Sequence, residues 1–385
     1  KNMITTQTAD GVLKSYYLEA ITEQLNLSAN PLLAAIERTT SDVWGKDVKK
    51  PVVYGVHGGI GAGKEDGNLP TASDGGYAQL TATLKNLYGQ IEITDKALRA
   101  SQSNEGAFID LLGTELDGLV RSASFNLGRM LYGDGSGLLA TVSAATNGVY
   151  TVDSVRNLAV GQVLDIVSAE GTTVAFGRTV TGVDRAENTI TLSGSNLSIA
   201  ECKLYVQGSK GLELTGLGAI FSDSETLYGL DRATHGWLKP HTVENVGTLT
   251  ENAIQKAIDM VEANGGGRVN FIVCSWGVRR ALFELLADKR SMESVELTGG
   301  FKAMSYNGIP VVADRFCPEK TMYLLNTDDF RLHQLCDWQW LEAESGRVLH
   351  QSASKASYTA TLVKYAELMC YRPCGQAALT GITEK

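Results

Sequence analysis

The chain has 385 residues, of which 43% are hydrophobic and 20% are charged, and its formal net charge is −9. This length exceeds what one ordinary hydrophobic core holds and predicts roughly two to three domains. The sequence has the composition of a globular protein and no run of about 18 uncharged apolar residues, which excludes a membrane-spanning helix. Because no long Lys/Arg cluster occurs, tight sequence-specific binding of nucleic acid is not expected.

Cysteine and histidine follow no metal-binding or secretory pattern. The six cysteines include no Cys-x-x-Cys pair, and none has a histidine at zinc-ligand spacing. Most are expected to be reduced core thiols of a cytoplasmic product, and disulfides are the less favoured alternative. The N-terminus lacks the apolar core of a secretory signal and does not begin with Met, so a removed leader is compatible with it. We expect no metal and no cofactor.

The N-terminal part predicts amphipathic helices followed by a long hairpin. Apolar residues recur at three- and four-residue steps through residues 11–38, on both sides of Asn30-Pro31. These short pieces have no evident core of their own, which is typical of an arm that packs on something else. Residues 49–93 then contain an apolar strand, a glycine-rich stretch from Gly55 to Gly76 and a returning strand with a bulge near Asn86.

The glycine-rich stretch approaches the spacing of a phosphate-binding loop. In Val56–Glu65, VHGGIGAGKE, the glycines and Lys64 nearly match Gly-x-x-x-x-Gly-Lys-Ser/Thr. Glu65 replaces the hydroxyl that would bind magnesium, and no helix-forming sequence follows to hold a phosphate at its N-terminus. A hairpin tip is therefore favoured, and a nucleotide hydrolase is kept only as a remote alternative.

The strongest helix signal begins after residue 104. Apolar residues keep a 3.6-residue period from Phe108 to Leu131, which predicts one helix roughly 36 Å long. Asn104 is the candidate N-cap and Gly133 the candidate C-cap.

Residues 146–208 change to short alternating strands separated by turns at intervals of about ten residues, which predicts a small β-barrel or sandwich inserted in a larger domain. After Leu212 the pattern is mixed α/β. Thr248-x-x-Glu251 is a candidate capping box, the helix after it ends at Gly265-Gly-Gly, and Ser275 is expected to cap a second helix.

The order of these elements resembles the major capsid proteins of tailed bacteriophages, which have the Hong Kong ninety-seven-like fold. Ile93-Thr-Asp-Lys-Ala-Leu98 is similar to the start of that family's spine helix, and Met130-Leu-Tyr-Gly-Asp-Gly-Ser-Gly137 to its end. Asn307-Gly-Ile-Pro-Val-Val312, Phe316-Cys-Pro318 and Tyr323-Leu-Leu-Asn326 are similar to a later family segment. The inserted β-module departs from the minimal fold, and an encapsulin shell is the competing identity because it shares the architecture.

The resemblance implies an α+β fold with an N-terminal arm, an extended β-hairpin loop, a long spine helix, an α/β axial domain and an inserted small all-β domain. The implied divisions are the arm at 1–47, the hairpin loop at 48–93, a peripheral domain at 94–145 and 326–370, the inserted barrel-like domain at 146–208 and the axial domain at 209–325 and 371–385.

The implied function is that of a structural subunit without enzyme activity. It would assemble in the host bacterial cytoplasm into hexamers and pentamers of an icosahedral virion shell. The shell would enclose double-stranded DNA without sequence-specific binding, consistent with an acidic wall. The implied partners are a scaffolding protein or cleaved leader, a portal, a maturation protease and a decoration protein.

The candidate site residues are inter-subunit contacts. Some relatives cross-link a hairpin lysine to an asparagine of a neighbouring subunit, but nothing in this sequence identifies the asparagine or the assisting acid. A solvated or salt-bridging Lys64 is therefore favoured. Glu65, Arg279 and Arg280 are further candidates for contact with a neighbouring subunit. The sequence contains no serine-hydrolase elbow, zinc-helix motif or calcium loop, so no catalytic constellation is predicted.

Overall fold

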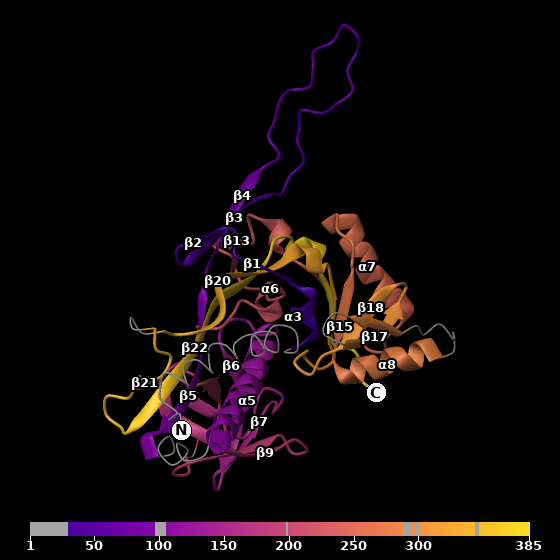
Figure 1. The fold of residues 1–385 in the computed structure, drawn as a ribbon. Coiled ribbons are helices and arrows are strands. Elements are labelled where there is room, and N and C mark those ends of the chain that lie inside the picture. The colour runs from indigo at the N-terminus through magenta and orange to yellow at the C-terminus, as the bar shows by residue number, and fades with distance from the viewer. Residues whose placement is uncertain (1–29, 97–104, 198, 288–293, 298–300, 343–345) are drawn as a thin grey trace.

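A computed structural model describes residues 30–96, 105–197, 199–287, 294–297, 301–342 and 346–385. Figure 1 shows a body made of several packed parts, from which one thin hairpin projects. No helix in the described part of the chain is long and apolar enough to cross a membrane. The mixture of long helices with several sheets confirms the predicted α+β class.

The projecting hairpin grows out of a three-stranded antiparallel sheet. The sheet order is β2-β3-β4, with β2 at Val43–Trp44, β3 at Asp47–Val53 and β4 at Tyr77–Thr83. Its register runs from Asp47 opposite Thr83 to Val53 opposite Tyr77. Val48 and Leu80 are buried on its inner face, so one face of the ribbon is held by the body.

The long helix α5, Glu105–Met130, packs against a five-stranded sheet. In this sheet β22 lies between β20 and β5. Alternate residues of β5 are buried, including Leu87, Ile91 and Ile93, because one face of that strand covers the helix. The strands are β1 at Glu37–Thr39, β5 at Lys85–Thr94, β20 at Phe330–Trp340, β21 at His350–Gln351 and β22 at Ser357–Cys370.

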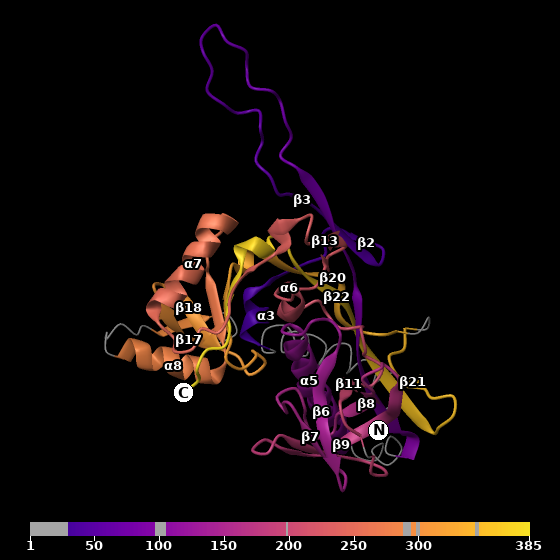
Figure 2. The ribbon, with the colours of Figure 1, turned by 180° about the vertical axis from the view of Figure 1, so that it is seen from behind.

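A closed six-stranded barrel lies beside α5, as seen from behind in Figure 2. Its order is β10-β7-β6-β11-β8-β9, and its interior is a separate cluster of buried residues that includes Leu158, Leu164 and Leu204. The strands are β6 at Leu138–Thr146, β7 at Val149–Val152, β8 at Val163–Val167, β9 at Thr173–Asp184, β10 at Thr189–Leu192 and β11 at Cys202–Val206.

The α/β part is a seven-stranded mixed sheet with two helices, α7 at Glu251–Gly265 and α8 at Trp276–Ala287. The buried faces of both helices share one core cluster with the sheet. The sheet order is β14-β23-β19-β15-β18-β17-β16. The strands are β14 at His241–Val243, β15 at Phe271–Cys274, β16 at Ser294–Leu297, β17 at Phe301–Tyr306, β18 at Ile309–Ala313, β19 at Met322–Leu325 and β23 at Ala377–Leu379.

Short elements connect these parts. They are α3 at Pro31–Ala35, α6 at Leu217–Ile220, β12 at Thr226–Leu227, β13 at Leu230–Asp231, and the 3-10 turns η2 at Gly236–Leu238, η3 at Thr327–Asp329 and η4 at Pro373–Gly375.

Several predicted boundaries differ from the structure. The helix after Asn30 is one short piece, and Glu37–Thr39 forms strand β1 because the chain there pairs in parallel with β20. The cap of α7 is Thr250, whose Oγ1 accepts from the Ala253 amide, and not Thr248. The predicted helix before residue 30 and the predicted cap Asn104 lie outside the described residues.

Two differences between the structure and the sequence analysis move predicted domain boundaries. The domain divisions themselves stay a prediction. The returning strand breaks at Leu84, and β5 joins the peripheral sheet instead of the hairpin. The barrel begins at Leu138 with β6, eight residues before the predicted insertion, because β6 pairs with β7 and β11. Long-range strand pairing decided both boundaries.

Candidate functional site

The hairpin is the most exposed element of the described chain. Beyond β3 and β4 its two arms are joined by backbone hydrogen bonds from Tyr54 to Gly76 and from Gly55 to Gly75, at 3.2 and 2.7 Å. A Cβ at Gly55 would lie 2.5 Å from the Gly75 carbonyl oxygen, so the close approach of the two arms requires glycine. Further out the arms run as irregular chain away from the body (Figure 1).

Three large apolar side chains on this hairpin have almost no cover. Val56, Ile60 and Leu69 are 92%, 85% and 89% exposed. Burying such a side chain stabilises a protein by roughly 1.5–3 kcal/mol, so three of them on one projecting loop mark a surface that a partner is expected to cover.

The base of the hairpin is held by an aromatic stack. The Tyr54 ring lies parallel to the Trp237 ring, with centroids 5.6 Å apart and an interplanar angle of 8°. His235 meets the Tyr54 ring edge-on at 5.7 Å. On the other arm, the Thr81 amide donates to the Tyr228 carbonyl at 2.9 Å. These contacts set the direction in which the hairpin leaves the body.

Lys64 and Glu65 lie exposed near the end of the hairpin. A turn follows them, in which the Gly67 amide donates to the Lys64 carbonyl at 3.0 Å. The chain then returns as loop to β4, and no helix begins there. The phosphate-loop alternative therefore lacks the helix N-terminus that binds the anion.

Arg279 and Arg280 lie on α8, far along the chain from the hairpin residues. The Arg279 guanidinium sits over the Trp276 ring at 4.7 Å from the centroid. Arg280 is exposed, and its Nε donates to the carbonyl of Lys385. Arg279 is partly buried beside the half-exposed Trp276 ring, whereas Arg280 remains exposed. The structure does not bring the two arginines together with Lys64 and Glu65 within one subunit.

The spine helix is tied to two distant segments by buried polar contacts that the sequence pattern did not reveal. Arg129, only 4% exposed, makes a two-pronged ion pair with buried Glu213 at 2.7 and 2.6 Å. Asn30 donates to the Gly128 carbonyl at 3.1 Å and caps α3 by accepting from the Leu33 amide at 2.7 Å. Only the folded chain brings these residues together, because 84 and 98 residues separate the pairs.

The arm is fixed to the peripheral sheet by a second polar set. Lys364, fully buried, donates to Asp337 at 2.7 Å and to Gln334 at 2.9 Å. Arg38 of the arm reaches the same Asp337 at 3.3 Å. Burial lowers the pKa of Lys364, and the Asp337 carboxylate opposes that shift. This network therefore joins β1, β20 and β22.

No group in the described residues has the features of a catalytic site. No set of three or more His, Cys, Asp or Glu in this part of the chain could hold a metal ion. All six cysteines are free thiols, and burial raises the pKa of Cys274 to about 12, so its thiolate is not formed at neutral pH. That the chain has no catalytic constellation therefore stays a prediction from the sequence.

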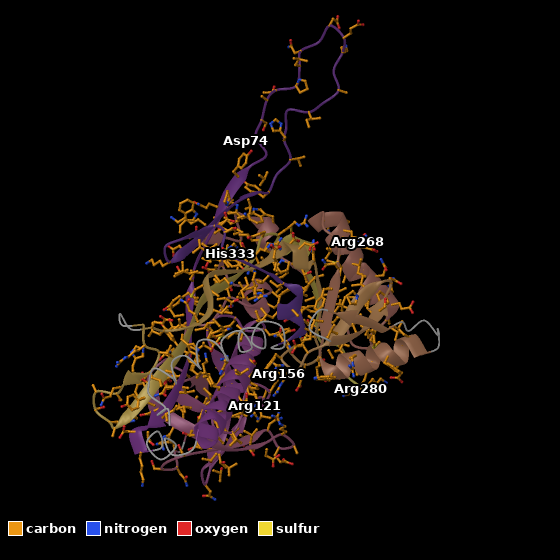
Figure 3. All side chains as sticks on the ribbon, viewed as in Figure 1. Asp74, Arg121, Arg156, Arg268, Arg280 and His333 are labelled. Atoms are coloured by element: carbon orange, nitrogen blue, oxygen red, sulfur yellow. The ribbon has the colours of Figure 1, made fainter. Side chains whose placement is uncertain are left out.

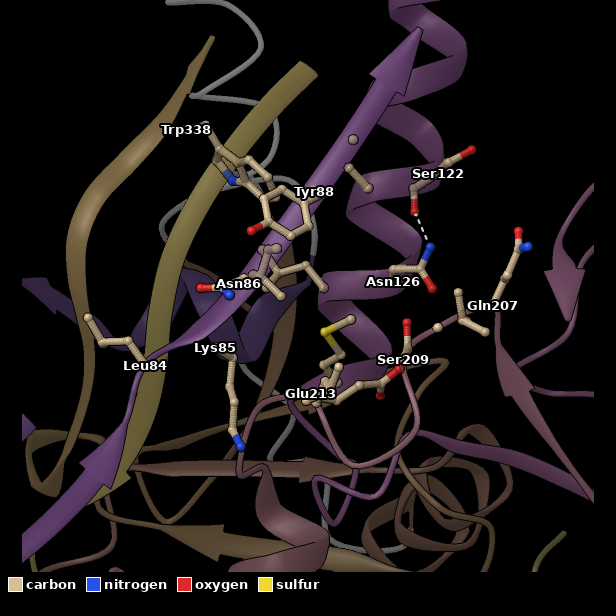
Figure 4. Close-up of a pocket in the computed structure, with 18 of the residues that line it drawn as sticks. Leu84, Lys85, Asn86, Tyr88, Ser122, Asn126, Gln207, Ser209, Glu213 and Trp338 are labelled. Atoms are coloured by element: carbon tan, nitrogen blue, oxygen red, sulfur yellow. Dashed lines mark hydrogen bonds between the residues drawn. The ribbon is translucent and has the colours of Figure 1, made fainter. Parts of the chain in front are cut away.

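A cavity of about 570 Å³ lies between β5, α5 and the segment after β11 (Figure 4). Leu119, Leu127 and Met130 are among its apolar lining residues. Of the polar groups that line it, Asn126 donates to the Ser122 carbonyl and Glu213 is paired with Arg129. This cavity has no converging acid, base and nucleophile.

Part of the chain matches a known protein family, and the whole chain matches solved structures. Residues 169–355 match the family described as SU10 major capsid protein. No curated protein sequence matches the chain significantly. Among solved structures, the Cyanophage A-1(L) capsid asymmetric unit has a TM-score of 0.55 at 14% identity, covering 100% of this chain and 97% of the other.

Two further structures have lower scores. The SrpI encapsulin complex from Synechococcus elongatus PCC 7942 has a TM-score of 0.48 at 10% identity and covers 92% of this chain and 89% of its own. The capsid of Myoviridae phage XM1 has a TM-score of 0.44 at 10% identity and covers 91% of both chains.

Residues 169–355 match a family of phage major capsid proteins, and the chain along its whole length shares the fold of a phage capsid subunit, the Hong Kong ninety-seven-like fold. The chain is therefore similar to the structural subunits that form phage shells.

Proposed function

We propose that this chain is the major capsid protein of a tailed phage, which assembles into hexamers and pentamers of an icosahedral virion shell around double-stranded DNA. The observation that carries the proposal is the projecting hairpin, whose apolar side chains Val56, Ile60 and Leu69 are uncovered in the single subunit. In this proposal a second copy of the chain covers these apolar side chains. The glycine-rich arms can bend to meet slightly different neighbours in rings of five and six.

The proposed contact with DNA is enclosure without specific recognition. The chain carries 43 acidic and 34 basic residues, so its average field repels a polyanion. A wall of the same sign as the packaged DNA does not hold the incoming strand by counterion release.

Lys64, Glu65, Arg279 and Arg280 are proposed as residues that meet a neighbouring subunit, because each presents charge at the surface or packs on an exposed ring. A scaffolding protein or cleaved leader, a portal, a maturation protease and a decoration protein are the proposed further partners. They are the components that a shell of this fold class would need to close at one size and fill.

The test compares the wild-type chain with a variant in which residues 56–74 are replaced by a short Gly-Ser turn. Both proteins are expressed with any leader intact and examined by negative-stain electron microscopy and analytical ultracentrifugation. We expect closed icosahedral particles from the wild type, and soluble, folded, unassembled subunits from the variant. A wild-type protein that stays a compact monomer at every concentration would contradict the proposal. The contents of purified virions, DNA or a packed enzyme, separate a phage shell from a cellular compartment.

A further inference from the structure

A buried lysine lies between an amide and a carboxylate in the sheet that packs on α5. Lys364 on β22 is fully buried, and its Nζ donates to Gln334 Oε1 at 2.9 Å and to Asp337 Oδ1 at 2.7 Å. Gln334 is itself only 8% exposed, and the centroid of the Trp338 ring lies 5.7 Å from the same Nζ. An amine, an amide carbonyl and a carboxylate therefore meet at one place from which water is largely excluded.

An irregularity in β20 brings both polar partners to the same lysine. Gln334 lies opposite Ala366, two residues from Lys364 on β22, so Gln334 and Lys364 share one face of the sheet. In a regular strand Asp337, three residues after Gln334, would lie on the other face. The register between the two strands shifts between Gln334 and Cys336, and such a shift changes the face on which the following side chains lie. Asp337 therefore reaches Lys364 as well.

The surroundings favour the reactive form of the Lys364 amine. Burial lowers the pKa of Lys364, which increases the share of the neutral amine, the form with a free electron pair. The Asp337 carboxylate opposes this shift, whereas the charge of Arg38 supports it. A carboxylate held at hydrogen-bond distance from an amine can also take its proton, as a general base does.

We propose that Lys364 and Gln334 join in an amide cross-link within one subunit. The Lys364 Nζ attacks the Gln334 Cδ, and Asp337 takes a proton from the attacking nitrogen. The bond between Cδ and the original amide nitrogen then breaks, and Asp337 returns the proton to that nitrogen, which leaves as ammonia. The exchange of one amide for another needs no oxidant or reductant. It occurs once in each chain and is therefore not an enzyme activity with turnover.

The competing electrophile is the carboxyl group of Asp337, which would form an amide with loss of water. Gln334 is favoured because a neutral amide carbonyl accepts the electron pair of an amine more readily than an ionised carboxylate does. Asp337 also forms an ion pair with Arg38 at 3.3 Å, and this contact favours the ionised carboxylate.

The cross-link lies inside the body and does not depend on assembly. It would tie β20 to β22 between residues that are 30 positions apart. Figure 3 shows His333, the residue before Gln334, in the body and apart from Asp74 on the hairpin. Because no hairpin residue and no second subunit take part, the cross-link and the proposed shell function can fail separately.

Mass spectrometry of the purified full chain, before and after assembly, tests this bond. We expect the intact chain to be lighter than its sequence by the mass of one ammonia molecule. Trypsin does not cut after a lysine whose amine is part of an amide. The digest should therefore contain residues 332–347 joined to residues 356–385.

Three variants assign the roles of the three side chains. Lys364→Met removes the nucleophile and Gln334→Met removes the electrophile, so each variant should have the full mass of its sequence. Asp337→Asn keeps the size of the side chain and removes the proton acceptor. It should slow bond formation in freshly folded protein by about 100-fold or more, as expected for one acid–base group. The Asp337 side chain is 31% exposed, so this variant tests the mechanism even if Lys364→Met does not fold.

Lys50→Met is the matched control, because Lys50 also pairs with an aspartate, Asp42, at 2.7 Å, but its side chain is 32% exposed. This variant should keep the ammonia deficit and the joined peptides. A wild-type chain with the full mass of its sequence, both fresh and after long storage, would show that the three groups are only hydrogen-bonded and would overturn the proposal. Loss of water, or an ammonia deficit that the digest places at other residues, would overturn it as well.

Discussion

The Arg129–Glu213 pair offers a direct test of how the spine helix is held. Both side chains are almost completely buried, at 4% and 3% exposure, and the two hydrogen bonds between them measure 2.7 and 2.6 Å. Replacing Arg129 by Met leaves the Glu213 carboxylate buried and without its cation. Breaking a buried pair from one side costs about 3–5 kcal/mol, whereas replacing both partners by apolar residues of similar volume is often nearly neutral.

The size of the expected change follows from the length of the chain. With a specific unfolding entropy of about 2.1 cal/mol/K per residue, a loss of 3–5 kcal/mol lowers the melting temperature of a chain of this length by about 4–6 °C. We expect Arg129→Met to show this shift in a thermal melt of the unassembled protein followed by circular dichroism. The double variant Arg129→Met, Glu213→Leu should melt within about 2 °C of the wild type.

The expected results require that the Arg129 and Glu213 side chains stabilise the fold only together. If the double variant melts as low as Arg129→Met, the loss comes from packing of the arginine stem and not from an uncompensated charge. If Arg129→Met melts with the wild type, water or another cation reaches Glu213, and the buried pair does not hold the helix end.

Three further predictions concern other parts of the molecule. Burial raises the pKa of Glu367 to about 7, so its contribution to stability is present below its ordinary pKa of 4.5 and is lost as the pH rises through 7. Glu367→Gln removes the cost of burying a charged carboxylate, which is up to about 3 kcal/mol above pH 7. The variant should therefore raise the melting temperature at pH 8 but not at pH 4.5. Equal shifts at both pH values would contradict burial as the cause. Tyr54→Phe should assemble normally, whereas Tyr54→Ala loses a stack worth about 0.5–1.5 kcal/mol and should lower shell yield in electron microscopy without unfolding the body. Gly128→Ala places a Cβ 2.5 Å from the Phe316 ring and should lower the unfolding free energy by about 1–3 kcal/mol in a denaturant titration, and an unchanged midpoint would show that the ring can move aside.

Local patterns in the sequence determined much of the secondary structure. The 3.6-residue period predicted one long helix, and the structure has it at Glu105–Met130. Alternation predicted β7, β8, β9 and β10, and the glycine after α7 was expected to end it, as Gly266 does with a φ of 59°. These features depend on neighbours within a few residues, so composition and spacing are enough to reveal them.

Only the tertiary structure decided where each strand pairs and which charges meet. Strand β5 joins β22 across more than 250 residues, and β1 pairs with β20 although the periodicity there favoured helix. Arg129 meets Glu213 through contacts that no local pattern encodes. A pairing between distant segments depends on the burial of whole faces and on backbone hydrogen bonds that form together when the chain is compact. For that reason the sequence could predict the long helix and most strands of the barrel, while the pairing of distant strands and the buried Arg129–Glu213 contact became visible only in the fold.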